Sequence, residues 1–242
     1  MAVFGIIGYP LGHSFSKKYF EEKFRQLGIE RDASFQNFAM ETMEELPQVL
    51  STPGLEGFCI TIPHKKNIIA YLTEVAPEVG EMGACNCVRI KDGQLFGYNT
   101  DIIGFEKSFV PQLTPERNKA LVLGTGGASA AVTFVLKKQG IPYRCVSRNT
   151  PGTWSYSQIN KDIIDQYKII VNCTPLGMFP NVDSAPPLPY QYLTEKHYLY
   201  DLVYNPAETK FLSLGKEKGA ATENGLQMLV LQAEENWRIW NS

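Results

Sequence analysis

One stretch of the 242-residue chain decides the fold: KALVLGTGGASA, residues 119–130. Its first part, 119–123, is an apolar run that predicts a short buried strand, and helical spacing follows over 131–139. Between them lies the glycine-rich pattern G-x-G-G-A. A strand, a glycine-rich turn and a helix in this order are typical of a dinucleotide-binding unit. We therefore predict a nucleotide site here. A tight strand–helix connection without a ligand is the alternative.

The residues of this unit have separate expected roles. Gly124 permits the tight turn, and Gly126 lets a pyrophosphate approach the backbone at the helix N-terminus. The next predicted strand, 143–147, ends in Ser147 and Arg148 without an acidic residue. An acid there would bind the ribose hydroxyl of NAD, whereas a basic residue binds the 2′-phosphate of NADP. Arg148 therefore favours NADP, with a plain surface arginine as the alternative.

A second stretch, CITIPHKK at residues 59–66, ends another predicted strand. Pro63 stops this strand because it has no N–H to donate to the ladder. Lys65 then stands near the expected start of a helix over 66–72, where a cation is disfavoured. A partly desolvated lysine at the carboxyl edge of a sheet is a candidate for acid–base chemistry. A solvated lysine in a turn is the alternative, and that is the role we expect for Lys66.

Strands and helices alternate along the chain, which predicts mostly parallel α/β sheets. We expect strands at 3–7, 33–38, 57–62, 87–90, 94–98, 119–123, 143–147, 168–173, 198–203 and near Ala221. We expect helices at 17–27, 42–51, 66–72, 102–109, 131–139 and 226–240. The polar segment 101–117 marks a domain boundary. The sequence thus predicts a first α/β domain over 1–101, completed by the C-terminal helix 226–242, and a Rossmann-type domain over 102–225.

The composition argues against several classes of function. The 23 basic and 25 acidic residues give a net charge of −2, which leaves no basic surplus for a nucleic acid. No apolar run has the length of a membrane span, and the N-terminus lacks the basic start of a signal peptide. Five cysteines and three histidines without a zinc spacing predict neither a disulfide framework nor a metal site. We expect a cytoplasmic, metal-free protein with a small-molecule substrate.

Eight stretches, taken in order, resemble the shikimate dehydrogenases. They are GYPLGHSFS (8–16), TIPHK (61–65), GACNCV (83–88), GYNTD (97–101), GTGGA (124–128), NCTPLGM (172–178), YDLVYNP (200–206) and GLQMLVLQA (225–233). The resemblance implies reversible hydride transfer between NADPH and 3-dehydroshikimate, giving shikimate, in aromatic amino-acid biosynthesis. It also implies that the first domain binds the substrate, that the second binds NADP, and that the active site lies in the cleft between them.

The resemblance further implies roles for single residues. Lys65 and Asp101 would handle the proton, because reducing a ketone places negative charge on its oxygen. Asp101 could instead cap the helix that follows it. The implied substrate-binding residues are Ser14, Ser16, Thr61, Asn86, Tyr204 and Gln232. The implied cofactor-binding residues are Gly124, Gly126, Gly127, Ala128, Ser147, Arg148, Thr174, Leu202, Gly225 and Met228. Each position taken alone also fits a cap, a turn or a core role.

The chain departs from the family pattern at three places. Cys59 stands where the family usually has an asparagine, so one substrate-side amide is missing. The stretch SKKYF at 16–20 replaces the usual proline and His-Asn pair. No second basic residue follows Arg148 within 149–154, which leaves dual use of NAD and NADP open. A quinate/shikimate dehydrogenase and a non-catalytic NADP-binding sensor of the same fold are the alternatives. The chain is expected to be a monomer or a homodimer.

Overall fold

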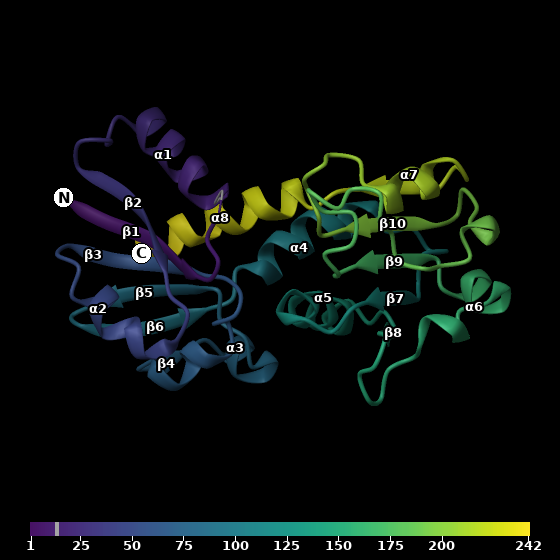
Figure 1. Ribbon diagram of the computed structural model, residues 1–242, viewed down its shortest axis with the longest axis horizontal. Coiled ribbons are helices and arrows are strands. Elements are labelled where there is room, and N and C mark those ends of the chain that lie inside the picture. The colour runs from purple at the N-terminus through teal and green to yellow at the C-terminus, as the bar shows by residue number, and fades with distance from the viewer. Residues whose placement is uncertain (13–14) are drawn as a thin grey trace. The chain divides into compact units, whose positions relative to one another are not determined.

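The computed structural model describes residues 1–12 and 15–242, which fall into two units. The first unit consists of residues 1–100 and 233–242, and the second of residues 101–232. Each unit is built on its own sheet (Figure 1). Among the described residues, no helix is both long and apolar enough to cross a membrane.

The first unit contains a six-stranded mixed sheet of order β2-β1-β3-β5-β6-β4. Its strands are β1 (Ala2–Gly8), β2 (Ala33–Ala39), β3 (Leu55–Ile60), β4 (Glu74–Val75), β5 (Cys87–Lys91) and β6 (Gln94–Tyr98). Strands β1, β2 and β3 are parallel, and β5 is antiparallel to both β3 and β6. The carboxyl ends of β1, β3 and β6 and the amino end of β5 therefore share one edge, which we call the first edge.

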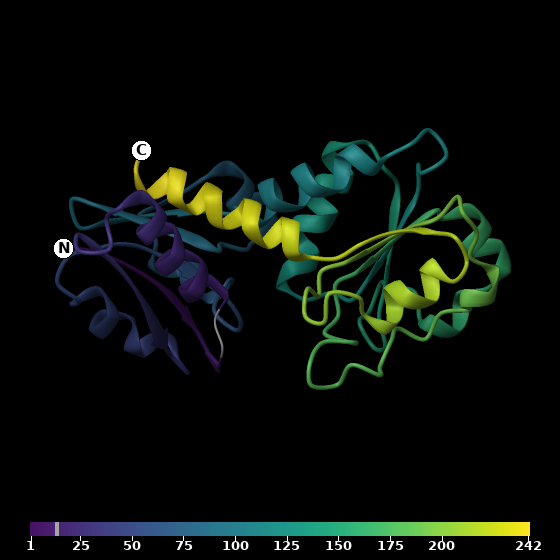
Figure 2. The same cartoon turned by 90° about the horizontal axis from the view of Figure 1, so that it is seen from above.

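An aromatic core holds the helices of this unit to the sheet. Its helical segments are α1 (Phe15–Leu27), η1 (Met43–Glu45), α2 (Leu46–Leu50), η2 (Asn67–Tyr71), α3 (Pro77–Met82) and the end of α8 (Leu226–Trp240). Phe20 of α1 stacks on Phe35 of β2, and Phe4 of β1 stacks on Trp240 of α8, each with ring centroids 4.9 Å apart. Helices α1 and α8 thus lie side by side against the sheet (Figure 2).

The helix predicted over 66–72 is present in a shorter form and with a different geometry. Residues 63–66 form turns, and only Asn67–Tyr71 is helical, with 3-10 geometry. The backbone N–H of Thr73 already donates to the carbonyl of Leu95, 2.8 Å away, so the chain enters the sheet before a full α-helix can develop. The helix predicted over 42–51 is likewise divided into η1 and α2.

The second unit contains a five-stranded, fully parallel sheet of order β11-β10-β9-β7-β8. Its strands are β7 (Ala120–Leu123), β8 (Tyr143–Val146), β9 (Ile169–Asn172), β10 (Tyr198–Asp201) and β11 (Ala221–Glu223). Every residue of β7, β9 and β10 is buried, as expected for a parallel sheet covered on both faces. All five carboxyl ends share one edge, which we call the second edge. The predicted fold class is confirmed.

The helices of the second unit are α4 (Asp101–Phe109), α5 (Gly127–Lys138), α6 (Lys161–Gln166), α7 (Lys210–Lys216) and the first part of α8, with the short segments η3 (Val110–Gln112), η4 (Tyr156–Gln158) and η5 (Tyr190–Tyr192). The sequence pattern did not predict α3, α6 and α7, which are six or seven residues long. Two turns of helix are too short for a 3.6-residue periodicity to stand out.

The last residues of the chain are fixed on the first sheet by Trp240. Its Nε1 donates to the carbonyl of Val88, 3.0 Å away, and the side chain is 5% exposed. Gly57 of β3 makes room for this ring. A Cβ atom at residue 57 would collide with the indole and lie 2.9 Å from the Val88 carbonyl oxygen.

We therefore expect Gly57→Ala to lower the free energy of unfolding by about 1–3 kcal/mol, because the methyl group displaces Trp240. Urea denaturation followed by fluorescence measures this change. Gly80→Ala in α3 is the matched control, since a Cβ there meets nothing within 4 Å. It should leave the stability unchanged or raise it. Equal stabilities of the two variants would contradict the packing described.

Candidate functional site

The residues predicted to bind the cofactor all follow strand ends at the second edge. Gly124, Gly126, Gly127 and Ala128 follow β7, Ser147 and Arg148 follow β8, Thr174 follows β9, Leu202 follows β10, and Gly225 and Met228 follow β11. Ligands of open α/β sheets bind outside the carboxyl ends of the strands. The structure thus brings these positions to the one edge of the sheet where such a ligand is held.

The glycine-rich turn has the geometry of a phosphate cradle. Gly124 has a φ of 97°, and a Cβ atom there would lie 2.9 Å from Cγ2 of Thr174, so the loops after β7 and β9 are packed together. A Cβ atom at Gly126 would meet nothing within 4 Å. Gly126 precedes the first turn of α5, which has no side-chain cap and no acidic residue. The N–H groups of this turn are therefore suited to an anionic group.

Arg148 stands on a turn that is tied to the glycine-rich loop. Ser147 Oγ accepts a hydrogen bond from the Thr150 N–H at 2.8 Å and lies 2.7 Å from Thr153 Oγ1. Thr150 Oγ1 in turn lies 3.1 Å from Thr125 Oγ1 of the glycine-rich loop. Ser147 is buried and Arg148 is exposed. Ser147 therefore shapes the turn, and the turn presents Arg148 beside the cradle.

A buried carboxylate fixes the neighbouring loops. Asp201 and Asn172, which end β10 and β9, are both 0% exposed, and Asn172 Nδ2 donates to Asp201 Oδ1 at 2.9 Å. Asp201 Oδ2 accepts from Thr209 Oγ1 at 2.6 Å, and Oδ1 accepts from the Val203 N–H at 3.0 Å. Asn172 Oδ1 accepts from the Thr174 hydroxyl at 2.6 Å. The loops that carry Thr174 and Leu202 are thus held in place by these two side chains.

Sequence reasoning missed Asp201 and Asn172 as supporting residues. Both lay inside the quoted motifs, and a polar residue that closes an otherwise apolar strand was the feature that could have identified them. After β11, the loop is held both by hydrogen bonds and by close approach: the Gly225 N–H donates to the Val203 carbonyl at 3.1 Å, and Asn224 Nδ2 donates to the Ala207 carbonyl at 2.7 Å. A Cβ atom at Gly225 would lie 2.7 Å from the Leu202 carbonyl carbon.

At the first edge, the segments that carry Thr61, Lys65 and Asn86 come together, since the Ile60 N–H donates to the Asn86 carbonyl and the Cys85 N–H to the Lys65 carbonyl. Thr61 follows β3, and its N–H donates to the Ile7 carbonyl at 2.9 Å. Ser16 lies buried in the first turn of α1, after β1. Asn86 precedes β5. Ser14, also predicted to bind the substrate, lies outside the described residues.

Two hydrogen bonds hold the segment that carries Lys65, one at its own carbonyl and one at the side chain of His64. Its carbonyl accepts from the Cys85 N–H at 2.7 Å, and the neighbouring His64 ring lies with Nε2 2.7 Å from the Met40 carbonyl oxygen. His64 is 1% exposed. Lys65 is half-buried, whereas Lys66 is exposed. Lys65 is thus less accessible to solvent than Lys66, and the separate roles expected for them stay predictions.

The remaining predicted residues belong to the second unit. Asp101 is the first residue of α4, and Gln232 lies on α8 with Nε2 donating to the Leu229 carbonyl at 2.9 Å. Gly104, one turn after Asp101, packs against α8: a Cβ atom there would lie 3.2 Å from Cβ of Gln232 and from Cγ of Met228. Tyr204 is half-buried in the loop after β10, and burial raises the pKa of its phenol.

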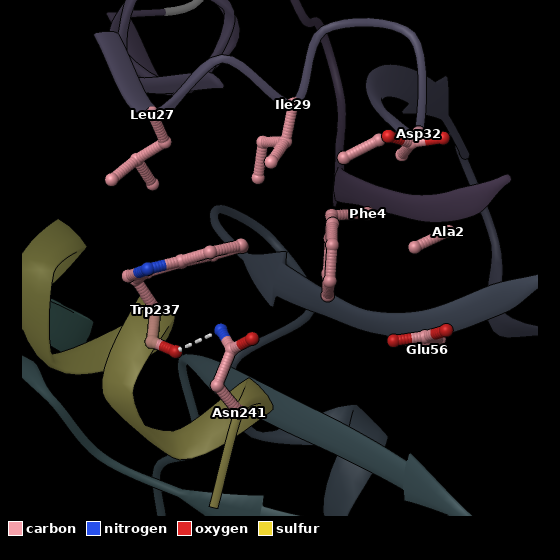
Figure 3. Close-up of a pocket in the computed structure, with 9 residues that line it drawn as sticks. Ala2, Phe4, Leu27, Ile29, Asp32, Glu56, Trp237 and Asn241 are labelled. Atoms are coloured by element: carbon pink, nitrogen blue, oxygen red, sulfur yellow. Dashed lines mark hydrogen bonds between the residues drawn. The ribbon is translucent and has the colours of Figure 1, made fainter.

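Figure 3 shows a pocket of the first unit that contains none of the predicted residues. It is lined mainly by apolar side chains, with Leu27, Ile29 and Phe4 around the ring of Trp237. Ala2 and Ala33, which begin β1 and β2, and Glu56, the second residue of β3, also line it, so the pocket lies at the amino edge of the sheet. The pocket therefore lies at the opposite end of the strands from the first edge and is not part of the candidate site.

The second unit has a parallel sheet with a glycine-rich phosphate cradle, and the edge of the first sheet carries a lysine and polar side chains. Together these features define a Rossmann-type, dinucleotide-dependent oxidoreductase. More specifically, the chain belongs to the shikimate dehydrogenase family. Residues 6–88 match the model of the shikimate dehydrogenase substrate binding domain. The shikimate dehydrogenase (NADP(+)) of Caldanaerobacter subterraneus subsp. tengcongensis is 33% identical over 255 residues, which cover 98% of this chain and 91% of that protein.

Solved structures agree with this family. Shikimate 5-dehydrogenase from Thermus thermophilus, in complex with NADP(H) and shikimate, has a TM-score of 0.86 and 32% identity, and the match covers 99% of this chain and 93% of that one. Shikimate 5-dehydrogenase from Listeria monocytogenes, in complex with shikimate and NAD, has a TM-score of 0.86 and 26% identity, over 100% and 92% of the two chains. The family resemblance of the sequence motifs is confirmed.

The Asp201 carboxyl leads to a prediction about stability. Burial raises its pKa to about 6, although hydrogen bonds from Thr209, Val203 and Asn172 act to lower it. The unfolded chain has an aspartate pKa of about 3.9, so the folded state binds the proton more tightly. The free energy of unfolding should therefore fall as the pH rises from about 4 to about 6, by at most about 1.4 kcal/mol per pH unit from this group.

Asp201→Asn should remove this component, because the amide keeps the shape without titrating. Thermal or urea unfolding at a series of pH values measures it. Asp183→Asn, at an exposed loop position, is the control and should keep the wild-type slope. An unchanged slope in Asp201→Asn would show that Asp201 is not the titrating group.

Proposed function

We propose that this chain catalyses the reversible, NADP-dependent reduction of 3-dehydroshikimate to shikimate. The proposal depends on one observation: every predicted cofactor-binding position lies at the second edge. The Caldanaerobacter shikimate dehydrogenase also matches this chain over 98% of the chain's length. The predicted cytoplasmic location and the monomeric or homodimeric state stay predictions.

The two units would divide the work. We propose that the first unit binds the substrate, which the match of residues 6–88 to a substrate binding domain supports. The second unit would hold NADP at the second edge. The expected active site in the cleft between the two domains and the predicted domain bounds, 1–101 with 226–242 and 102–225, stay predictions.

NADP would make two kinds of contact at the second edge. The first turn of α5 would bind the pyrophosphate through its N–H groups, and Arg148 would bind the 2′-phosphate through its guanidinium. NADPH, when bound, supplies the hydride. A second candidate is use of NAD or of both cofactors, favoured by the absence of a second basic residue within 149–154 and by the NAD complex of the Listeria relative.

Lys65 and Asp101 would manage the proton of the reaction. Reduction of the ketone develops negative charge on its oxygen, and Lys65 Nζ would donate a proton to that oxygen. Asp101 would hold the same hydroxyl group of the product and orient the ammonium. Ser14, Ser16, Thr61, Asn86, Tyr204 and Gln232 would bind the carboxylate and the ring hydroxyls.

Arg148→Ala should weaken NADP binding about 10- to 100-fold, because charged hydrogen bonds to the 2′-phosphate are lost. Binding of NAD, which lacks this phosphate, should change little. Isothermal titration with both cofactors measures the difference. Arg144→Ala is the matched control, because Arg144 is an exposed arginine of β8 that lies over the Trp154 ring. Unaltered NADP affinity in Arg148→Ala would argue against this role.

Lys65→Ala should lower kcat by about 10²- to 10⁴-fold, with a much smaller effect on KM for shikimate, because a positioned proton donor is lost. Steady-state assays of shikimate oxidation test this. Lys66→Ala is the control, as Lys66 is exposed and adjacent. Near-normal turnover of Lys65→Ala would rule out its assignment as the proton donor.

One assay tests the function as a whole. Turnover of shikimate and of quinate is measured with NADP and with NAD. We expect activity with shikimate and NADP to exceed the other three combinations. Comparable activity with quinate would favour a quinate/shikimate dehydrogenase. Cofactor binding without turnover of either substrate would favour the non-catalytic sensor.

A further inference from the structure

A buried line of polar side chains connects the C-terminal helix to Asn86. Asn86, Thr100 and Asn236 are 3%, 1% and 0% exposed, and they come from before β5, after β6 and from α8. Thr100 Oγ1 lies 2.6 Å from Asn236 Oδ1 and 3.1 Å from Asn86 Nδ2. At the far end, Asn236 Nδ2 lies 3.1 Å from the sulfur of Cys59 in β3. All four residues belong to the first unit.

The backbone determines the orientation of the Asn86 amide. The Thr100 N–H lies 2.7 Å from Asn86 Oδ1, and an N–H can only donate, so this end of the amide is the oxygen. Nδ2 is then the end that donates to Thr100 Oγ1. The main chain of Asn86 is held as well. Its N–H donates to the Tyr98 carbonyl at 3.0 Å, and its carbonyl accepts from the Ile60 N–H at 2.8 Å.

The single proton of the Thr100 hydroxyl has two acceptors to choose from. Asn236 Oδ1 lies 2.6 Å away, and Asn86 Oδ1 lies 3.2 Å away. The proton belongs to the shorter bond. Asn236 therefore turns the hydroxyl proton away from Asn86 and leaves a lone pair of Thr100 Oγ1 for Asn86 Nδ2. Both hydrogen bonds are therefore donated in the same direction: Asn86 donates to Thr100, and Thr100 donates to Asn236.

We propose that Asn236, acting through Thr100, is a positioning residue that holds the Asn86 amide as a hydrogen-bond donor to the substrate. This inference rests on the proposed function, in which Asn86 binds the shikimate ring. One Nδ2 hydrogen of Asn86 is used by Thr100, and the second is the hydrogen that the amide can offer to a ring oxygen. Because both ends of the Asn86 amide are hydrogen-bonded, the amide cannot flip. Substrate binding therefore does not have to pay the entropy of fixing this side chain.

Loss of the Asn236 oxygen would reverse this arrangement. The Thr100 hydroxyl would donate to Asn86 Oδ1, and Asn86 Nδ2 would lose the lone pair that holds it. Cys59 is consistent with this arrangement, because a sulfur atom is only a weak acceptor for Asn236 Nδ2. The stronger hydrogen bond of Asn236 is the one with Thr100. The side chain of Cys59 is 5% exposed and faces Asn236 in the interior.

The test compares variants that remove or keep the acceptor. Asn236→Leu and Thr100→Val remove the polar atoms with a similar branched shape, whereas Asn236→Asp and Thr100→Ser retain an acceptor oxygen and a hydroxyl. Steady-state kinetics should show KM for shikimate raised about 3- to 10-fold in the first pair, as expected for one lost hydrogen bond. The second pair should lie near wild type, and kcat and KM for NADP should change little in all four variants.

Two controls separate positioning from general damage. Ile239→Ala removes a buried apolar side chain from the same helix and should lower stability without raising KM for shikimate. The double variant Thr100→Val with Asn236→Leu should be no worse than the more affected single variant, because both act through one line. If Asn236→Leu does not fold, as judged by circular dichroism, Thr100→Val and Thr100→Ser make the same comparison.

The outcomes are distinguishable. A wild-type protein that neither binds nor turns over shikimate would overturn the proposed function and this inference with it. An active wild type with unaltered KM in both Asn236→Leu and Thr100→Val would overturn the inference alone. An equal rise of KM in Ile239→Ala, or additive effects in the double variant, would assign Asn236 a merely structural role.

Discussion

Parallel pairing delivers the carboxyl end of every strand to the same edge of a sheet, and both units depend on this constraint. In the second unit it collects residues from β8, β7, β9, β10 and β11, which are separated by up to about a hundred positions in the chain. In the first unit, the antiparallel β5 adds its amino end to the edge formed by β1, β3 and β6. A residue such as Asn86 therefore reaches the first edge from before a strand, whereas Thr61 reaches it from after one.

Each edge is stabilised by buried polar side chains that touch no solvent. Asp201 and Asn172 hold loops of the second unit, and Asn236 and Thr100 hold Asn86 in the first. Leaving one such group without its partner costs about 1–3 kcal/mol, so each side chain specifies the position of the others. Apolar packing alone would fill the same space without determining which way an amide or hydroxyl points.

The parts of the fold that depend on neighbouring residues could be predicted from the sequence. The strand–glycine–helix unit at 119–139, the strands at 87–90 and 94–98 and the helix at 226–240 all follow from local chemistry. The helix at 66–72 could not be judged locally, because the pairing of Thr73 with Leu95 ends it. Asn236 was missed for the same reason, since its partner Thr100 lies 136 positions away. The residues of the candidate site were found through whole motifs, while their buried supports depend on contacts that no motif contains.

The last ten residues also determine when the first unit can be completed. Its strands lie within residues 1–100, yet its aromatic core includes Ala233, Ile239 and Trp240, which are synthesised only after the whole second unit. The second unit is contiguous in sequence and has no such dependence. Domains usually fold in the order of their synthesis, N-terminal first. In this chain the first unit can be completed only after residues 101–232 have been synthesised, so the second unit has the earlier opportunity to fold.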